Sequence, residues 1–141
     1  MILIVDSGST KTDWIAINNK GEILFQTQTL GLNPQVLTDY IIEERIVNNF
    51  DLYQNRKSVT KLYFYGAGCG TEPPRLMIKG VFLNIFKTAE VLVKEDTFAA
   101  IYATADINKK SIVCILGTGS NCTYFDGVNV IQKITSLGYI L

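Results

Sequence analysis

The opening stretch of the chain, residues 2–12, constrains its fold more than any other part of the sequence. It begins with four consecutive apolar residues, Ile2 to Val5, a pattern typical of a strand buried on both faces. This strand runs directly into Asp6 and a turn of small residues, S-G-S-T. Residues 13–18 and 22–29 then predict two further strands, joined by a turn at 19–21. The sequence therefore predicts an antiparallel meander of three strands, with the small-residue turn inside its first hairpin.

The small-residue turn offers donors suited to phosphate, although it is not a P-loop. A P-loop requires glycine immediately before the Lys-Thr pair and a helix after it, whereas here Thr10 precedes Lys11 and a strand follows. Gly8 lets the backbone approach a ligand closely, and Asp6 would hold hydrated Mg²⁺ against the phosphates. The hydroxyl donors are those of Ser9, Thr10 and Thr12. Taken alone, the same residues more often form an ordinary tight turn.

A second copy of the same unit begins at residue 111. Residues 111–116 form an apolar run, the turn Gly117-Thr118-Gly119-Ser120 follows, and residues 121–125 and 128–134 predict two more strands around a turn at 126–127. A repeated unit predicts two similar lobes, and two phosphate-binding hairpins that face each other would hold a nucleotide between them. This is the pattern of the actin-like ATPase and sugar kinase superfamily, which is built from duplicated ribonuclease-H-like domains.

Within that superfamily, four motifs narrow the resemblance. They are D-S-G-S-T-K-T at Asp6 to Thr12, G-L-N-P at Gly31 to Pro34, E-D-T-F-A-A at Glu95 to Ala100, and G-T-G-S-N-C at Gly117 to Cys122. In this order and spacing the chain resembles the N-acetylglucosamine kinase branch of the BadF/BadG/BcrA/BcrD ATPase family. The resemblance implies ATP-dependent phosphorylation of the primary hydroxyl of an amino sugar, with Mg²⁺ as the metal and an aspartate as the base.

The resemblance also implies roles for individual residues. Asp96 would be the catalytic base, Asp6 the metal ligand, and Asn33, Asp96 and Asn121 the contacts to the sugar. The predicted phosphate-binding residues are Gly8, Ser9, Thr10, Lys11 and Thr12 in the first hairpin and Gly117, Thr118, Gly119 and Ser120 in the second. From the residues alone, Asn33 and Asp96 have an alternative interpretation, because each precedes a predicted helix and is a residue type that caps helix N-termini.

The stretch between the two hairpins alternates strands with helices. A helix is expected from Asn33-Pro34 to Phe50, and a second opens at Pro73-Pro74. Strands are expected at 62–65 and 91–93, and a further helix at 98–104. The apolar stripe of the first helix would comprise Val36, Leu37, Tyr40, Ile41, Val47 and Phe50, and that of the second Leu76, Met77, Val81, Phe82, Ile85 and Phe86. The alternation predicts an α/β fold, a mixed sheet with flanking helices, whose ligands lie off the carboxyl ends of its parallel strands.

Composition excludes several classes of function. The formal net charge is zero and no basic run is present, which argues against nucleic acid or an anionic membrane surface as a partner. The apolar runs are too short to span a bilayer and no signal-peptide pattern is present, so we expect a cytoplasmic protein. The three cysteines show no C-x-x-C spacing, which favours reduced thiols. Because the chain has no histidine, any general base is expected to be a carboxylate.

The two copies predict two domains of unequal completeness. A first ribonuclease-H-like domain is expected at 1–108, and residues 109–141 would begin a second that the chain does not complete. We therefore expect an N-terminal part of a longer kinase that is inactive by itself and associates into dimers or larger assemblies. Two alternatives remain open from the sequence. One is a BadF-type activator ATPase that couples nucleotide hydrolysis to a partner enzyme and shares an iron–sulfur cluster, for which Cys114 and Cys122 do not look free. The other is a non-catalytic nucleotide-binding fragment.

Overall fold

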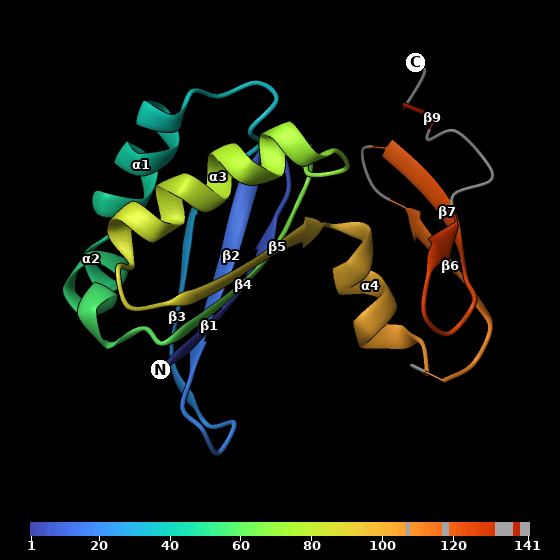
Figure 1. Ribbon diagram of the computed structural model, residues 1–141, viewed down its shortest axis with the longest axis horizontal. Coiled ribbons are helices and arrows are strands. Elements are labelled where there is room, and N and C mark those ends of the chain that lie inside the picture. Colours follow the sequence, from blue (N-terminus) through green and yellow to red (C-terminus); the bar gives the residue numbers. More distant parts are fainter. Residues whose placement is uncertain (107, 117–118, 132–136, 139–141) are drawn as a thin grey trace. The chain divides into compact units, whose positions relative to one another are not determined.

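The computed structural model describes residues 1–106, 108–116, 119–131 and 137–138 (Figure 1). The chain forms two compact units, Met1–Asp96 and Thr97–Leu141, which are described separately below. The predicted domain boundary between residues 108 and 109 stays a prediction. Within the described part of the chain, no helix has both the length and the apolar character needed to cross a bilayer.

The first unit is built on a sheet of five strands in the order β3-β2-β1-β4-β5. The strands are β1 (Ile2–Ser7), β2 (Lys11–Ile17), β3 (Ile23–Leu30), β4 (Lys61–Gly66) and β5 (Glu90–Glu95). β1 and β2 pair antiparallel, as do β2 and β3, whereas β4 runs parallel to both β1 and β5. This arrangement confirms the predicted mixed sheet. Because β1, β4 and β5 are parallel, their carboxyl ends lie at one edge of the sheet.

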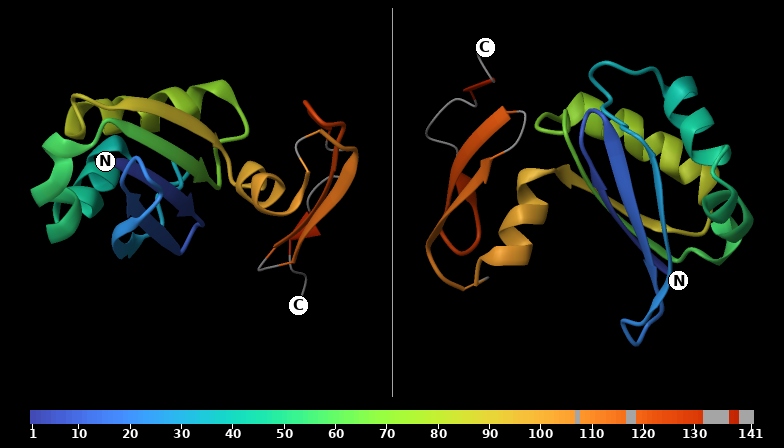
Figure 2. Two further views of the ribbon diagram at one scale, coloured as in Figure 1. Left: turned by 90° about the horizontal axis from the view of Figure 1, so that it is seen from below. Right: turned by 180° about the vertical axis from the view of Figure 1, so that it is seen from behind.

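The helices of the first unit pack on one face of this sheet (Figures 1 and 2). They are α1 (Asp39–Val47), α2 (Phe50–Asn55), the short 3₁₀ helix η1 (Arg56–Ser58) and α3 (Glu72–Ile85). Alternate strand residues such as Leu3 and Val5 point into the core, and Ile4 between them is 37% exposed. The aromatic centre of the core is Phe82 of α3, whose ring lies 5.0 Å from that of Phe64 and 6.3 Å from that of Trp14, between ring centroids.

The predictions for α3 hold except at one residue. The helix has its prolines in the first turn, where the missing N–H groups have no helical partner to lose. The buried residues of α3 include Val81, Phe82 and Ile85 as expected, and Met77 packs against the core, but Leu76 is 60% exposed.

The helix predicted from Asn33 to Phe50 is confirmed only at Asp39–Val47, and its predicted start is wrong. The Asn33 side chain instead closes a turn, because its Oδ1 accepts a hydrogen bond from the Gln35 N–H at 2.9 Å. α1 begins only after Thr38, whose hydroxyl caps it, and α2 begins after Asn49, which caps it in the same way. The predicted apolar stripe is wrong at three positions, since Val36, Tyr40 and Phe50 are 72%, 71% and 76% exposed. The residues buried in their place are Ile42, Ile46 and Leu52.

The second unit contains one helix and an antiparallel sheet. Its elements are α4 (Thr97–Thr104), β6 (Ser111–Leu116), β7 (Gly119–Phe125), β8 (Val130–Ile131) and β9 (Leu137–Gly138). β6 and β7 pair antiparallel, as the repeated motif predicted, and β8 and β9 both pair with β7. The turn at 126–127 is also confirmed, with Gly127 at a φ of 104° that favours glycine. Of the strand expected at 128–134, β8 accounts for residues 130–131, and residues 132–134 lie outside the described part.

Candidate active site

Four predicted features of the first unit meet at the carboxyl edge of its sheet. The backbone fixes this edge: the Ala67 N–H donates to the Ser7 carbonyl at 2.8 Å, and the Asp96 N–H donates to the Gly66 carbonyl at 3.2 Å. The ends of β1, β4 and β5 are thereby tied together. Asp6, the Asn33 turn, the glycine loop at 66–70 and Asp96 all belong to segments at this edge, which is where the sequence predicted ligands to lie.

Asp6 and Asp96 are close enough to influence each other electrostatically. Partial burial raises the pKa of Asp6 above its ordinary value, and the negative charges of Asp96 and Asp13 raise it further, with Lys11 acting in the opposite direction. Within the described residues, no three acidic or thiol side chains gather into a metal cluster. Two carboxylates that repel each other but do not form a complete set of metal ligands are suited to hydrated Mg²⁺. This ion is commonly held by one or two carboxylates together with water and phosphate. Asp6 and Asp96 are the residues that would face such an ion.

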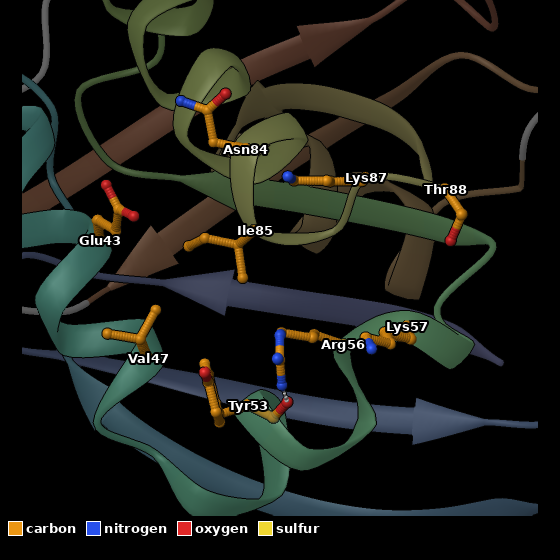
Figure 3. Close-up of a pocket in the computed structure, with 9 residues that line it drawn as sticks. All are labelled: Glu43, Val47, Tyr53, Arg56, Lys57, Asn84, Ile85, Lys87 and Thr88. Atoms are coloured by element: carbon orange, nitrogen blue, oxygen red, sulfur yellow. Dashed lines mark hydrogen bonds between the residues drawn. The ribbon is translucent and has the colours of Figure 1, made fainter.

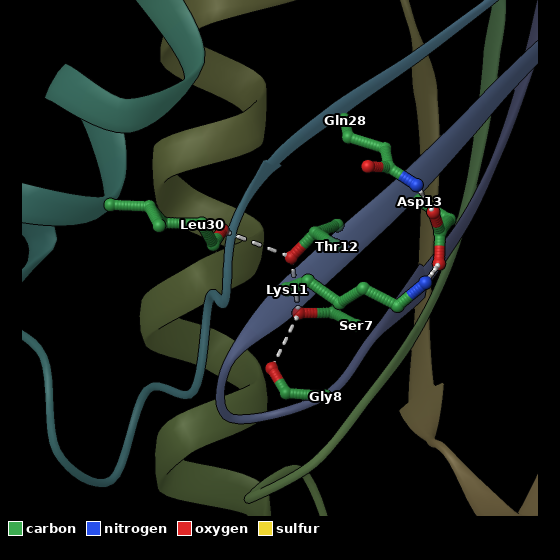
Figure 4. Close-up of polar contacts among 7 residues, drawn as sticks. All are labelled: Ser7, Gly8, Lys11, Thr12, Asp13, Gln28 and Leu30. Carbon is green, nitrogen blue, oxygen red and sulfur yellow. Dashed lines mark hydrogen bonds and ion pairs between the residues drawn. The ribbon is translucent and has the colours of Figure 1, made fainter.

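The first hairpin presents its turn to solvent. The Gly8 N–H donates to the Lys11 carbonyl at 3.0 Å, which leaves Ser9 and Thr10 exposed at the tip. Lys11 does not point freely outward, because its Nζ lies 2.9 Å from a carboxylate oxygen of Asp13 (Figure 4). This exposed ion pair is weak, so the ammonium group remains available to an anion. Gly8, Ser9, Thr10 and Lys11 therefore all lie in the turn that the sequence assigned to phosphate.

Thr12 is used inside the protein rather than at its surface. Its hydroxyl is fully buried, lies 2.8 Å from the Ser7 hydroxyl oxygen and donates to the Leu30 carbonyl at 3.2 Å (Figure 4). Ser7 in turn accepts a hydrogen bond from the Leu32 N–H at 3.1 Å. Sequence reasoning missed Ser7, because the only signal was its position directly after Asp6. The Ser7–Thr12 pair joins β1, β2 and the segment that follows β3.

Asn33 lies against the turn at 8–11. Its Nδ2 donates to the Ser9 Oγ at 3.3 Å, and nearby the Gly31 N–H donates to the Thr10 carbonyl at 2.8 Å. Arg45 of α1 donates a hydrogen bond from its guanidinium to the Gly31 carbonyl. The Asn33 turn is therefore held both by the hairpin tip and by α1.

The glycine loop after β4 also touches the Asn33 turn. Gly68 has a φ of 80°, and a Cβ placed there would overlap the Oδ1 of Asn33. A Cβ on Gly70 would lie 3.5 Å from a carboxylate oxygen of Glu95. The glycines therefore allow the backbone of this loop to come close to side chains of the protein itself.

The second hairpin is described by itself. Gly117 and Thr118 lie outside the described residues, whereas Gly119 and Ser120 begin β7 and pair with β9. Asn121 faces Ile115 across the hairpin, and its Oδ1 accepts a hydrogen bond from the Thr123 hydroxyl at 2.8 Å. The assignment of phosphate to residues 117–120 and of the sugar to Asn121 stays a prediction.

The structure also contains a cavity of about 430 Å³ away from this edge (Figure 3). It lies between α1, α2, η1 and the end of α3, and Lys87 and Thr88 on its wall precede β5, so it adjoins the amino ends of the strands. Three cations line it, Arg56, Lys57 and Lys87. Ligands of such sheets bind at the carboxyl ends of the strands, which separates this cavity from the predicted site.

The chain superposes on the putative N-acetylglucosamine kinase from Porphyromonas gingivalis with a TM-score of 0.86. The two sequences are 37% identical, and the match covers 100% of this chain and 50% of that one. The chain has the fold of the actin-like ATPases and sugar kinases. This similarity confirms the resemblance drawn from the motifs, and the chain spans half the length of the Porphyromonas gingivalis protein.

Two more distant structures share the actin-like fold. MreB5 of Spiroplasma citri, solved bound to ADP, matches 92% of this chain and 50% of its own with a TM-score of 0.62 at 14% identity. The inorganic polyphosphate/ATP-glucomannokinase from Arthrobacter sp. strain KM matches 95% of this chain and 62% of its own, with a TM-score of 0.57 at 17% identity. At these identities the likeness concerns the fold alone. No family model matches the sequence, and neither does any curated protein. Membership of the BadF/BadG/BcrA/BcrD family stays a prediction.

Removing the Ser7 hydroxyl should destabilise the first unit. In Ser7→Ala the buried Leu32 N–H loses its acceptor, and we expect the free energy of unfolding to fall by about 1–3 kcal/mol. Ser9→Ala is the matched control, because Ser9 is exposed and its change should stay within about 0.5 kcal/mol. Urea unfolding of both variants measures the difference. Equal stabilities would show that the buried hydroxyl pair does not hold the site.

The charge on Asp6 should lower the stability of the protein at neutral pH. Because its pKa is raised on folding, the folded state binds the proton more tightly, so stability falls as pH rises through that pKa. We expect Asp6→Asn to unfold at higher temperature than the wild type at about pH 7, with the advantage shrinking as pH falls toward the ordinary Asp value of 3.8.

Asp13→Asn is the control for this experiment. Its pKa is lowered, chiefly by the hydrogen bond with Lys11, so its charge is stabilising above the ordinary pKa and that contribution is lost at low pH. Asp13→Asn should therefore give no gain in melting temperature at about pH 7. Calorimetry across the pH range distinguishes the two variants, and a gain from Asp6→Asn that did not change with pH would contradict the electrostatic explanation.

Proposed function

We propose that the chain is the N-terminal part of an ATP-dependent sugar kinase that phosphorylates the primary hydroxyl of N-acetylglucosamine or a related amino sugar. The observation that carries this proposal is the convergence of two interacting carboxylates, Asp6 and Asp96, with the exposed turn at 8–11 and the Asn33 turn at one edge of the sheet. The similarity to the putative N-acetylglucosamine kinase from Porphyromonas gingivalis, which is 37% identical and of which this chain covers 50%, supports the choice of sugar.

Asp96 is the proposed general base. It lies immediately after β5, and its backbone N–H is fixed to the end of β4, so its position relative to Asp6 is set by the sheet rather than by a free loop. A carboxylate held in this way would orient the sugar hydroxyl and accept its proton as the phosphoryl group is transferred. The absence of histidine from the sequence leaves carboxylates as the natural candidates for this role.

The turn at 8–11 is the proposed phosphate site. Its exposed tip offers backbone N–H groups together with the Ser9 and Thr10 hydroxyls, and Lys11 adds a positive charge. Asp6 stands at the base of this turn and would hold the metal. When bound, Mg²⁺ neutralises negative charge on the phosphates. Thr12 takes a different role in this proposal, because its buried hydroxyl positions the turn from within.

Asn33 is the proposed sugar contact in the first unit. Its side chain is half-buried and sits between the phosphate turn and the glycine loop, so a sugar hydrogen-bonded to it would lie beside the turn at 8–11. This placement puts an acceptor alcohol next to a donor phosphate, which is the geometry that phosphoryl transfer requires. Asn121, in the second unit, stays a sugar contact implied by the sequence resemblance alone.

Replacing Asp96 should abolish turnover without abolishing nucleotide binding. In the full-length natural protein that contains this chain, we expect Asp96→Asn to lower kcat for N-acetylglucosamine by on the order of a hundredfold or more, with ATP affinity nearly unchanged. Glu90→Gln is the matched control, because Glu90 is an exposed acid at the opposite end of β5. A coupled assay for ADP release measures both. Near-normal turnover in Asp96→Asn would remove this residue from the mechanism, and a preference for glucose would change the substrate assignment.

Adding a side chain at Gly68 should weaken sugar binding selectively. In Gly68→Ala the new methyl group must displace Asn33 and also adopt a positive φ, so we expect KM for the sugar to rise roughly tenfold or more with a smaller effect on KM for ATP. Gly80→Ala is the control, because a Cβ there meets no atom within 4 Å and a helix favours alanine over glycine. Unchanged sugar KM in Gly68→Ala would separate Asn33 from sugar binding.

A further inference from the structure

The second unit places two cysteines directly opposite each other. Cys114 of β6 and Cys122 of β7 are register partners in the antiparallel hairpin. Their Sγ atoms lie 3.2 Å apart, and both thiols are free. Opposed residues in antiparallel strands have Cα atoms roughly 4.5–5.5 Å apart, within the roughly 4.4–6.8 Å that a disulfide spans. The two sulfur atoms can therefore form a bond with little movement of the backbone.

The pair lies on the open face of its hairpin. Ile112, two residues before Cys114 and so on the same face of β6, is 70% exposed. Thr123 and Phe125, on the other face of β7, are each 2% exposed. Cys114 itself is exposed. A small reagent in solution can reach its sulfur.

The third cysteine provides an internal comparison. Cys69 is fully buried, and burial raises the pKa of its thiol to about 12. Because the thiolate is the nucleophile in disulfide exchange, Cys69 is protected both by its protonation state and by lack of access. The hydrogen bond to Cys114 raises the pKa of Cys122, so the exposed sulfur of Cys114 is the point of entry for a reagent.

We propose that Cys114 and Cys122 form a redox modification site that takes a small disulfide, of the class of glutathione disulfide, as its co-reactant. The Cys114 thiolate attacks one sulfur of the reagent and forms a mixed disulfide, releasing one glutathione thiolate. The Cys122 thiolate then attacks the Cys114 sulfur and releases the second. The protein loses two protons and two electrons, and one glutathione disulfide becomes two glutathione molecules.

Oxidation would restrain the hairpin formed by β6 and β7. The new bond would close a short loop across β6 and β7, so opening of these strands would become rarer. This consequence follows from the hairpin itself and holds whether or not the turn binds ATP. The modification site is thus independent of the proposed kinase function.

Equilibration with glutathione buffers tests the proposal. The chain is incubated anaerobically with mixtures of reduced and oxidised glutathione in the presence of a chelator, and free thiols are then blocked by alkylation. Intact mass and peptide mapping should show a Cys114–Cys122 bond that forms in oxidising mixtures, disappears in reducing ones and leaves Cys69 to be alkylated only after denaturation. Cys69→Ala should behave like the wild type. Cys122→Ser should stop at a mixed disulfide on Cys114.

The equilibrium constant and amide exchange give two further readouts. The bond should form at least about tenfold more favourably in the native chain than in urea, because the folded hairpin holds the sulfurs together. Amide exchange along β6 and β7 should slow by roughly tenfold or more on oxidation. The proposal is overturned if the equilibrium constant for disulfide formation is the same in the native chain and in urea. It is also overturned if only disulfides between chains form. A third contrary outcome is a metal ion that binds the two thiols and blocks the reaction when no chelator is present.

Discussion

The buried hydroxyl of Ser7 forms the hydrogen bonds that connect the segments of the candidate site. Ser7 ends the central strand of the sheet, and its oxygen meets the Thr12 hydroxyl of β2 and the Leu32 N–H that follows β3. Buried polar groups are costly when unpaired, so these partners fix the spacing of the three segments. The turn at 8–11 lies between Ser7 and Thr12, and the Asn33 turn begins at the residue after Leu32. The hydrogen bonds of Ser7 therefore position both the turn at 8–11 and the Asn33 turn.

The chemistry assigned to the site conflicts with the stability of the fold at the same place. Partial burial raises the energy of the charged form of Asp6, and the negative charge of Asp96 adds to this cost. A cation would relieve the repulsion, so the arrangement is suited to a ligand that brings positive charge to the carboxylates. Gly68 is a second constrained position, since its positive φ favours glycine and the absence of a side chain leaves room for Asn33. Both features lie at the same edge of the sheet.

The second hairpin illustrates how one pattern can carry two properties. Its sequence G-T-G-S at 117–120 is rich in small residues, like the S-G-S-T of the first hairpin. The strands beside the turn additionally place Cys114 and Cys122 in register, with a separation of 3.2 Å between sulfur atoms. The motif G-T-G-S-N-C contains only one of these residues. The pairing of its cysteine with another eight positions earlier becomes visible only when the strands are aligned.

The sequence by itself determined the strands, their mixed order and the convergence of Asp6 and Asp96, because strand periodicity and the parallel connections leave few alternatives. It failed between Asn33 and Phe50, where the caps at Thr38 and Asn49 competed with an apolar pattern that suited one longer helix. Only the tertiary structure decided that Thr12 is buried, that Arg45 holds the Asn33 turn and that Gly68 faces Asn33. These depend on contacts between segments far apart in the chain, and local spacing carries no information about which buried hydroxyl, carbonyl or side chain will meet.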